Sequence, residues 1–122
     1  MIASVLIVDD EPDILETTQW AFEMAGFEVC TAVSAEDALP QAQAMRPQVM
    51  LIDYKLPKMN GLELLRSVKN WLPNVVAIII TGLTHQSENL EEESFRLGAA
   101  GFLHKPLQLE GVLKLVKEKI RP

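Results

Sequence analysis

The sequence predicts an α/β fold, a doubly wound parallel sheet of five strands with five helices, and three observations carry this prediction. Five short runs rich in Val, Ile and Leu alternate with five segments whose apolar residues recur every three or four positions. Such alternation is typical of parallel strands joined by crossover helices on both faces of a sheet. The 122 residues match the length of one domain, and no repeat, linker or low-complexity segment interrupts them. We therefore expect a single domain over residues 1–122.

The first strand is expected at Ser4–Val8, a continuous apolar run that ends at an acid pair. A helix follows, because Pro12 and Asp13 suit its first turn and Gly26 suits its end. The second strand is Phe27–Ala32. The inward face of the first helix is expected to hold Ile14, Thr18, Ala21, Phe22 and Ala25.

Ser34 has the side chain of a helix N-cap, so a second helix begins after it. Pro40 lies inside that helix and is expected to weaken or kink it. Pro47 stops the helix, and Val49–Ile52 is the third strand, followed by a loop over residues 54–60. The apolar face of the second helix is Ala35, Ala38, Leu39, Ala42 and Met45.

Gly61 begins the third helix, and Pro73-Asn74 is a turn before Val75–Ile80, the most apolar strand, which is expected to be central. The fourth helix is expected over His85–Leu97, and Ala100–Leu103 is the last strand. The inward residues of the third helix are Leu62, Leu65, Val68 and Leu72; those of the fourth are Leu90, Phe95 and Leu97; those of the fifth are Leu109, Val112, Leu113, Val116 and Ile120.

Composition excludes several classes of protein. Hydrophobic residues make up 48%, too many for a disordered chain. The net charge of −6 argues against direct binding of nucleic acid, whose phosphates attract basic proteins. The single cysteine, Cys30, cannot form an intramolecular disulfide or a Cys-rich zinc site, and we interpret it as a small core residue. The longest apolar run is far shorter than the roughly 20 residues of a membrane helix, so we expect a cytoplasmic protein.

Polar side chains stand at the carboxyl ends of four predicted strands. Asp9 and Asp10 follow the first strand, Asp53 the third, Thr81 the fourth and Lys105 the fifth. Ligands of doubly wound sheets bind beyond these strand ends. Three carboxylates at one edge would repel one another unless a cation neutralised them, and oxygen ligands suit Mg²⁺, or Mn²⁺ in its place.

The same edge carries groups that suit phosphoryl chemistry. The ammonium of Lys105 can bind a phosphoryl oxygen, and the hydroxyl of Thr81 can donate a hydrogen bond to another. A carboxylate such as that of Asp53 can act as the nucleophile and form an aspartyl phosphate.

Four motifs, in this order, make the sequence similar to a known family. They are Val8-Asp9-Asp10-Glu11, the loop from Asp53 to Gly61, Thr81-Gly82 and Lys105-Pro106. Over essentially its whole length the chain resembles the receiver domain of two-component response regulators, the fold of the bacterial chemotaxis response regulator. The resemblance implies a flavodoxin-like sheet with the strand order 2-1-3-4-5.

The resemblance assigns the acceptor and the metal ligands. Asp53 would accept the phosphoryl group from the phosphohistidine of a histidine kinase or a phosphotransfer protein. Asp10 would bind Mg²⁺ directly, Asp9 largely through water, and Asp53 would share the ion. Lys55 occupies the position whose backbone carbonyl binds the metal.

The resemblance also assigns the switch. Thr81 would follow the phosphoryl group, Phe102 would turn inward as Thr81 moves, and Lys105 would bind the phosphoryl oxygens. The Lys105–Pro106 peptide would be cis. The face built from the fourth helix, fifth strand and fifth helix would then change and signal to an output domain or protein partner.

Two features depart from the family pattern. The stretch from Thr81 to Lys105 is about two residues longer than usual, with the extra length expected within Gly82–Glu88. His104 stands where an apolar residue is usual, and could add pH sensitivity if its side chain points to the site or to a partner.

Each assignment competes with a plainer interpretation. Asp9 and Asp10 could cap the following helix, Asp53 could begin an Asx turn, and Phe102 could be plain core. Thr81 could be a β-branched strand end, and Lys105 a solvated charge. An acidic run such as residues 91–93 is most often a solvent-exposed helix face, although a surface that binds a basic partner is an open alternative. His85 is interpreted as a solvated loop residue, and neither histidine has metal-ligand spacing.

The expected function is a phosphorylation-activated switch that catalyses its own phosphorylation and dephosphorylation but has no separate turnover substrate. The alternative is a receiver-like interaction module that acts without phosphorylation. A flavin carrier is disfavoured, because Asp9-Asp10-Glu11 would repel the flavin phosphate. Whether the domain stands alone or is cut from a longer regulator, and whether it forms a homodimer, stay open at this point.

Overall fold

The structure, a computed structural model, describes residues 2–82 and 87–120. Strands and helices alternate along this part of the chain, as the sequence predicts. The strands are β1 (Ser4–Val8), β2 (Glu28–Ala32), β3 (Val49–Asp53), β4 (Val76–Thr81) and β5 (Gly101–His104). The helices are α1 (Pro12–Met24), α2 (Ala35–Met45), α3 (Gly61–Trp71), α4 (Ser87–Arg96) and α5 (Leu109–Lys119).

The described strands form one parallel sheet in the order β2-β1-β3-β4-β5. This confirms the predicted fold and strand order. The middle position belongs to β3, all of whose residues are buried, whereas β4 lies between β3 and β5. The expectation that Val75–Ile80 is central is therefore met only in that β4 is an interior strand.

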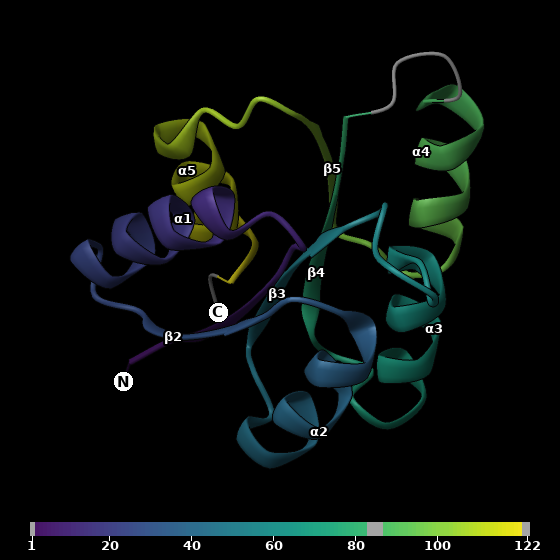
Figure 1. Ribbon diagram of the computed structural model, residues 1–122, viewed down its shortest axis with the longest axis horizontal. Coiled ribbons are helices and arrows are strands. Elements are labelled where there is room, and N and C mark those ends of the chain that lie inside the picture. The colour runs from purple at the N-terminus through teal and green to yellow at the C-terminus, as the bar shows by residue number, and fades with distance from the viewer. Residues whose placement is uncertain (1, 83–86, 121–122) are drawn as a thin grey trace.

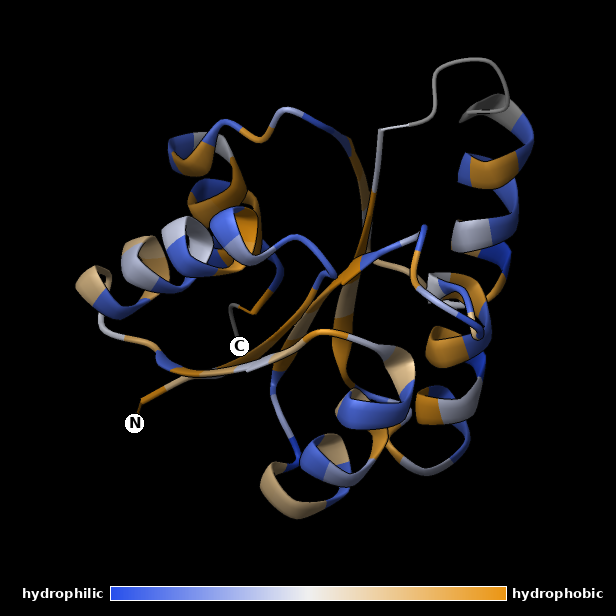
Figure 2. Cartoon of the chain, viewed as in Figure 1, coloured by the Kyte–Doolittle hydropathy of each residue, from blue (hydrophilic) through white to orange (hydrophobic). Residues whose placement is uncertain are grey.

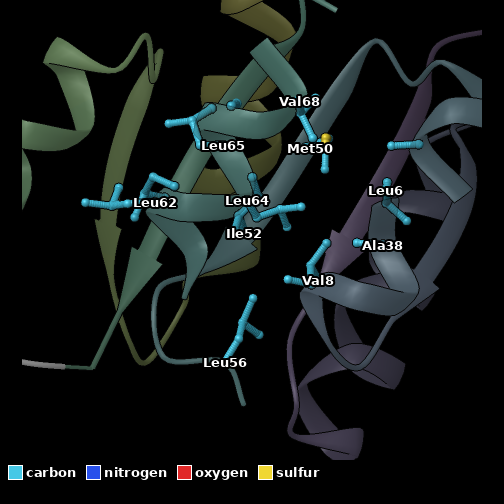
Figure 3. Close-up of a cluster of buried hydrophobic side chains, with 14 of the residues drawn as sticks. Leu6, Val8, Ala38, Met50, Ile52, Leu56, Leu62, Leu64, Leu65 and Val68 are labelled. Carbon is cyan, nitrogen blue, oxygen red and sulfur yellow. The ribbon is translucent and has the colours of Figure 1, made fainter. Parts of the chain in front are cut away.

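Helices cover both faces of the sheet, and each face has its own hydrophobic core. Figure 1 shows α1 and α5 on one side and α2, α3 and α4 on the other. Leu64, Leu65 and Val68 of α3 pack with Met50 and Ile52 of β3 in the core of the second side (Figure 3). The core of the first side is built around Val5, Phe22, Leu51, Ile78, Val112 and Val116. The cores are close-packed, so the sheet is a rigid frame for its edges.

Side-chain caps and glycines set several helix ends. The Ser34 hydroxyl accepts a hydrogen bond from the backbone N–H of Asp37, as the sequence predicts. Asn60 caps α3, and Glu63 returns a bond to the N–H of Asn60, which completes a capping box. Gly98 follows α4 with a positive φ of 102°, a conformation that favours glycine. The helix α2 continues past Pro40, so this proline does not end it.

The inward face of α4 differs from the prediction at one residue. Phe95 is 46% exposed, so its expected role as an apolar anchor is wrong. Ser94 is fully buried instead, and its hydroxyl donates to the carbonyl of Leu90 at 2.7 Å. Leu90 and Ser94 are four residues apart and share a face, whereas Phe95 is turned about 100° away from Ser94. The start of the helix predicted at His85 lies outside the described residues.

Two leucines that the sequence pattern left out are also buried. Leu15 of α1 and Leu64 of α3 are 7% and 0% exposed. Figure 2 shows the apolar colours concentrated on the strands and on the helix faces toward them. Within the part of the chain that the structure describes, no helix has both the length and the apolar character to cross a bilayer.

Candidate functional site

The polar residues singled out from the sequence lie at one edge of the sheet. Asp9 directly follows β1, Asp53 ends β3, Thr81 ends β4 and Lys105 directly follows β5. The backbone N–H of Lys105 donates to the carbonyl of Thr81 at 2.8 Å, which fixes the end of β5 against β4. Because β1, β3, β4 and β5 are neighbours in the sheet, their carboxyl ends bring these residues together.

The ammonium group of Lys105 is the centre of the site. Its Nζ lies 2.9 Å from Oδ2 of Asp53, 3.1 Å from Oδ2 of Asp9 and 3.2 Å from Oε1 of Glu11. Asp9 and Asp53 are each only 3% exposed. A buried carboxylate needs a counter-charge or hydrogen-bond donors, and Lys105 supplies both.

Backbone donors fix the second oxygen of each buried carboxylate. Oδ1 of Asp9 accepts from the N–H of Glu11 at 2.9 Å. Oδ1 of Asp53 accepts from the N–H of Lys55 at 3.4 Å, a longer and weaker bond. Both carboxylates are thus oriented by the turns that follow their strands, and the backbone bond to Asp53 is the longer of the two.

Burial and charge shift two pKa values in the site. Burial raises the pKa of Asp53 to about 6; the hydrogen bond from Lys105 opposes this shift, and the negative charge of Asp9 adds to it. Burial also lowers the pKa of Lys105, but hydrogen bonds and charges from Asp53 and Asp9 outweigh burial and raise it above its ordinary value. Lys105 therefore stays charged at neutral pH.

The donor set fits a small hard cation. Oxygen atoms of Asp9, Asp10, Glu11 and Asp53 all lie within 4.8 Å of one another. Opposite ligands of an octahedral Mg²⁺ ion are about 4 Å apart, so this spacing suits one such ion. Asp10, Glu11, Asp53 and Lys55 line a polar hollow of about 360 Å³ together with Gly82 and Lys105. The hollow has room for the water that Mg²⁺ usually keeps.

The predicted switch residues, Thr81 and Phe102, are not among the residues that line this hollow. Thr81 is 1% exposed at the end of β4. Phe102 on β5 is partly buried and packs against the core under α2, α3 and α4. Its ring meets the exposed His104 ring edge to face, with centroids 5.4 Å apart. The Lys105–Pro106 peptide is cis, as the family resemblance implies.

Glu11 is a site residue for which the sequence pattern predicted no role. It belongs to the quoted acid motif and stands next to Asp10, so its position at the strand end was the available signal. Its ion pair with Lys105 joins residues 94 positions apart, which no local pattern reveals.

The remaining expectations concern Cys30, the acidic run of α4 and the loop after β4. Cys30 is partly buried against the core on the α2 and α3 side, and Glu91, Glu92 and Glu93 are exposed. Most of the loop predicted to be longer than usual, residues 83–86 with His85 among them, lies outside the described residues.

The family model that matches this chain is one of response regulators, and the curated relatives FixJ and PhoP are transcriptional regulatory proteins. The family model of the response regulator receiver domain matches residues 5–117. The transcriptional regulatory protein FixJ of Rhizobium meliloti is 32% identical over 114 residues, which cover 93% of this chain and 55% of FixJ. The alkaline phosphatase synthesis transcriptional regulatory protein PhoP of Bacillus subtilis is 30% identical, over 99% of this chain and 50% of PhoP. The chain thus spans about half the length of the curated relatives it matches.

Solved structures agree with this match. A CheY-like response regulator receiver domain protein from Methanospirillum hungatei has a TM-score of 0.90 and 32% identity, covering 98% of this chain and 94% of that one. The chemotaxis response regulator CheY4 of Vibrio cholerae has a TM-score of 0.89 and 30% identity, covering 98% of this chain and 100% of that one.

Proposed function

The chain belongs to the family of response regulator receiver domains, and on that premise we propose that its single domain, residues 1–122, accepts a phosphoryl group on Asp53. Receiver domains are phosphorylation-activated switches of two-component systems. One observation carries the assignment: Asp53 is buried at the end of β3 with the Lys105 ammonium 2.9 Å from its Oδ2. A carboxylate held in this way presents a nucleophile beside a group that can balance phosphoryl charge.

The proposed reaction is a displacement at phosphorus. One carboxylate oxygen of Asp53 forms a bond to phosphorus while the bond from phosphorus to the donor's imidazole nitrogen breaks. The departing imidazole keeps the electron pair and is protonated. Lys105 is positioned to balance charge on the phosphoryl oxygens, and Thr81 to donate a hydrogen bond to one of them.

A divalent cation would complete the charge balance. Asp10 and Asp53 would hold Mg²⁺ or Mn²⁺, with Asp9 acting largely through water and Lys55 through its backbone carbonyl. The spacing of the oxygens of Asp9, Asp10 and Asp53 supports this assignment. When bound, the ion supplies positive charge to the transferred phosphoryl group.

The proposed response starts at Thr81 and Phe102. Thr81 follows the phosphoryl group, Phe102 turns inward, and the face of α4, β5 and α5 changes. The partial exposure of Phe102 beside α4 supports a ring that has room to move. Hydrolysis of the aspartyl phosphate by the domain itself would reset the switch.

The proposed partners follow from the chemistry and from the relatives. We propose a sensor histidine kinase or a phosphotransfer protein as the donor and a downstream domain or protein as the receiver of the signal, all in the cytoplasm. The relatives PhoP and FixJ carry names of transcriptional regulators and are about twice as long as this chain. The net charge of −6 does not support nucleic-acid binding by this domain itself. A homodimer through the α4, β5 and α5 face is an added proposal.

Intact-protein mass spectrometry after incubation with acetyl phosphate tests the acceptor. The wild-type protein should gain one phosphoryl group with Mg²⁺ and none with EDTA. Asp53→Asn should gain none, while the exposed control Asp37→Asn, in α2, should behave like the wild type. Labelling of Asp53→Asn at the wild-type level would overturn the assignment. A module that acts without phosphorylation would show no gain in any variant and would bind no Mg²⁺ in a titration.

A further inference from the structure

The Lys105 ammonium is already engaged by carboxylates, because it donates hydrogen bonds to Asp53 and Glu11 and forms an ion pair with Asp9. An ammonium group has three hydrogens to donate. Three carboxylate oxygens, from Asp53, Asp9 and Glu11, surround Nζ at 2.9, 3.1 and 3.2 Å. A phosphoryl oxygen on Asp53 therefore has to compete with these carboxylates for the ammonium.

The three partners of Lys105 are not equally firm. The side chains of Asp53 and Asp9 are 4% and 5% exposed, whereas that of Glu11 is 59% exposed. Charge pairs in water are screened, and a long exposed side chain loses conformational freedom when it is held in an ion pair. Glu11 is also the most distant of the three, so its contact with Lys105 is the one that breaks with the smallest loss of free energy.

We propose that Glu11 is a positioning residue that accepts a hydrogen bond from the Lys105 ammonium in the resting protein and is displaced from it by a phosphoryl oxygen on Asp53. This inference rests on the proposed function of Asp53. Glu11 thus acts as an internal stand-in for the phosphoryl group. Its backbone N–H meanwhile holds Asp9, so only the side chain needs to leave.

The Glu11–Lys105 ion pair disfavours the phosphorylated state relative to the unphosphorylated state. A phosphoryl group must break the Glu11–Lys105 pair to reach Nζ, and it then carries up to two negative charges beside a released carboxylate. Loss of the pair should therefore strengthen binding of a phosphoryl analogue. Exposed ion pairs of this kind correspond to about a two- to fivefold change in an equilibrium constant.

Beryllofluoride, a stable analogue of a phosphoryl group on a carboxylate, provides the test. Its dissociation constant is measured by isothermal titration calorimetry in the presence of Mg²⁺. Glu11→Gln removes the charge, whereas Glu11→Asp keeps the charge but shortens the side chain by one methylene. The control is Glu16→Gln, an exposed carboxylate on α1 that is not among the Lys105 partners or the lining of the hollow.

If Glu11 occupies Lys105 in this way, both Glu11 variants should bind beryllofluoride about two- to fivefold more tightly than the wild type, and Glu16→Gln should bind it unchanged. The Lys105 ammonium protons, observed by NMR at low temperature, should also exchange faster with water in both Glu11 variants, an effect that a merely structural role would not produce. Tighter binding in Glu11→Gln with wild-type binding in Glu11→Asp would mean charge repulsion alone and would overturn the inference. Unchanged or weaker binding in Glu11→Gln would overturn it too. A wild-type protein that binds no beryllofluoride at all would instead show that the proposed function of Asp53 fails, and the inference with it.

Discussion

Gly61 lies directly against the backbone of Asp53. A Cβ atom on Gly61 would stand 2.5 Å from the Asp53 carbonyl oxygen and 2.9 Å from the Cα of Tyr54. The N–H of Gly61 also donates to the carbonyl of Tyr54 at 2.8 Å. The loop that carries Lys55 therefore closes on itself where α3 begins, and only a residue without a side chain permits this approach.

Gly61→Ala should destabilise the protein by about 2–3 kcal/mol, because the atoms that meet the new methyl group belong to the backbone and cannot move aside. Urea unfolding monitored by circular dichroism measures the effect. Gly111→Ala in α5 is the matched control, since a Cβ atom on Gly111 would meet nothing within 4 Å. That variant should gain about 0.5–1 kcal/mol from helix propensity. Equal stability of the two variants would contradict the close approach.

Lys105→Met should destabilise the metal-free protein at neutral pH by about 2–4 kcal/mol, because it leaves two buried carboxylates without their counter-charge. Thermal unfolding in EDTA measures the loss. Lys105→Arg keeps the charge and should lose less, and the exposed Lys114→Met on α5 should lose nothing measurable. Adding Asp53→Asn to Lys105→Met should restore part of the stability. An additive loss in that double variant would argue that the two side chains are not coupled.

Asp53 should make the metal-free protein less stable as the pH rises. Its ordinary pKa is 3.8, and burial raises its pKa in the folded protein to about 6. Between these two values the folded state binds more protons than the unfolded state, so the free energy of unfolding falls with increasing pH. Above about pH 6 this lowers stability by on the order of 3 kcal/mol, and Lys105 stays charged throughout the window. Asp53→Asn should therefore exceed the wild type in stability above pH 6 and converge with it toward pH 4. A gap between the two that is constant with pH would contradict the raised pKa.

Mg²⁺ should stabilise the fold through the acidic cluster. An ion present at about ten times its dissociation constant adds about 1.4 kcal/mol to the free energy of unfolding, a shift of several degrees in the melting temperature. Differential scanning calorimetry with MgCl₂, against NaCl at equal ionic strength, measures this shift. Asp10→Asn should lose most of it, whereas Asp37→Asn should keep it. The same shift in Asp10→Asn would place the ion elsewhere.

The order of elements and the strand-end residues could be predicted from sequence because they depend on local patterns. A continuous apolar run followed by a polar residue marks a buried strand and its carboxyl end, as with Val49–Ile52 and Asp53. Parallel alternation then forces those ends to one edge. The cis Lys105–Pro106 peptide was predicted from family resemblance, since nothing in the dipeptide itself demands it.

What the sequence could not predict depends on tertiary contacts. Apolar character made Phe95 an expected anchor, yet the packing of α4 buries Ser94, whose hydroxyl is satisfied by the carbonyl of Leu90. A small polar side chain can be buried when its hydroxyl donates a hydrogen bond to a backbone carbonyl of the same helix, because no polar group is then left without a partner. The partners of Lys105 lie up to 94 positions away, so only the folded sheet reveals Glu11 as one of them.

The edge position of β5 gives the protein a part that can open while the rest of the sheet stays closed. This strand has four residues and, among the residues that the structure describes, pairs only with β4, whereas β3 has neighbours on both sides. Phe102 contacts the core on one face of the sheet and Leu103 the core on the other. Edge segments with few hydrogen-bonded neighbours undergo local unfolding at lower free energies than central strands. A change of charge beside Lys105 thus acts on a small cooperative unit that contacts both helical layers. Native-state hydrogen exchange should show that the amides of β5 exchange through local opening, independently of those of β1 and β3.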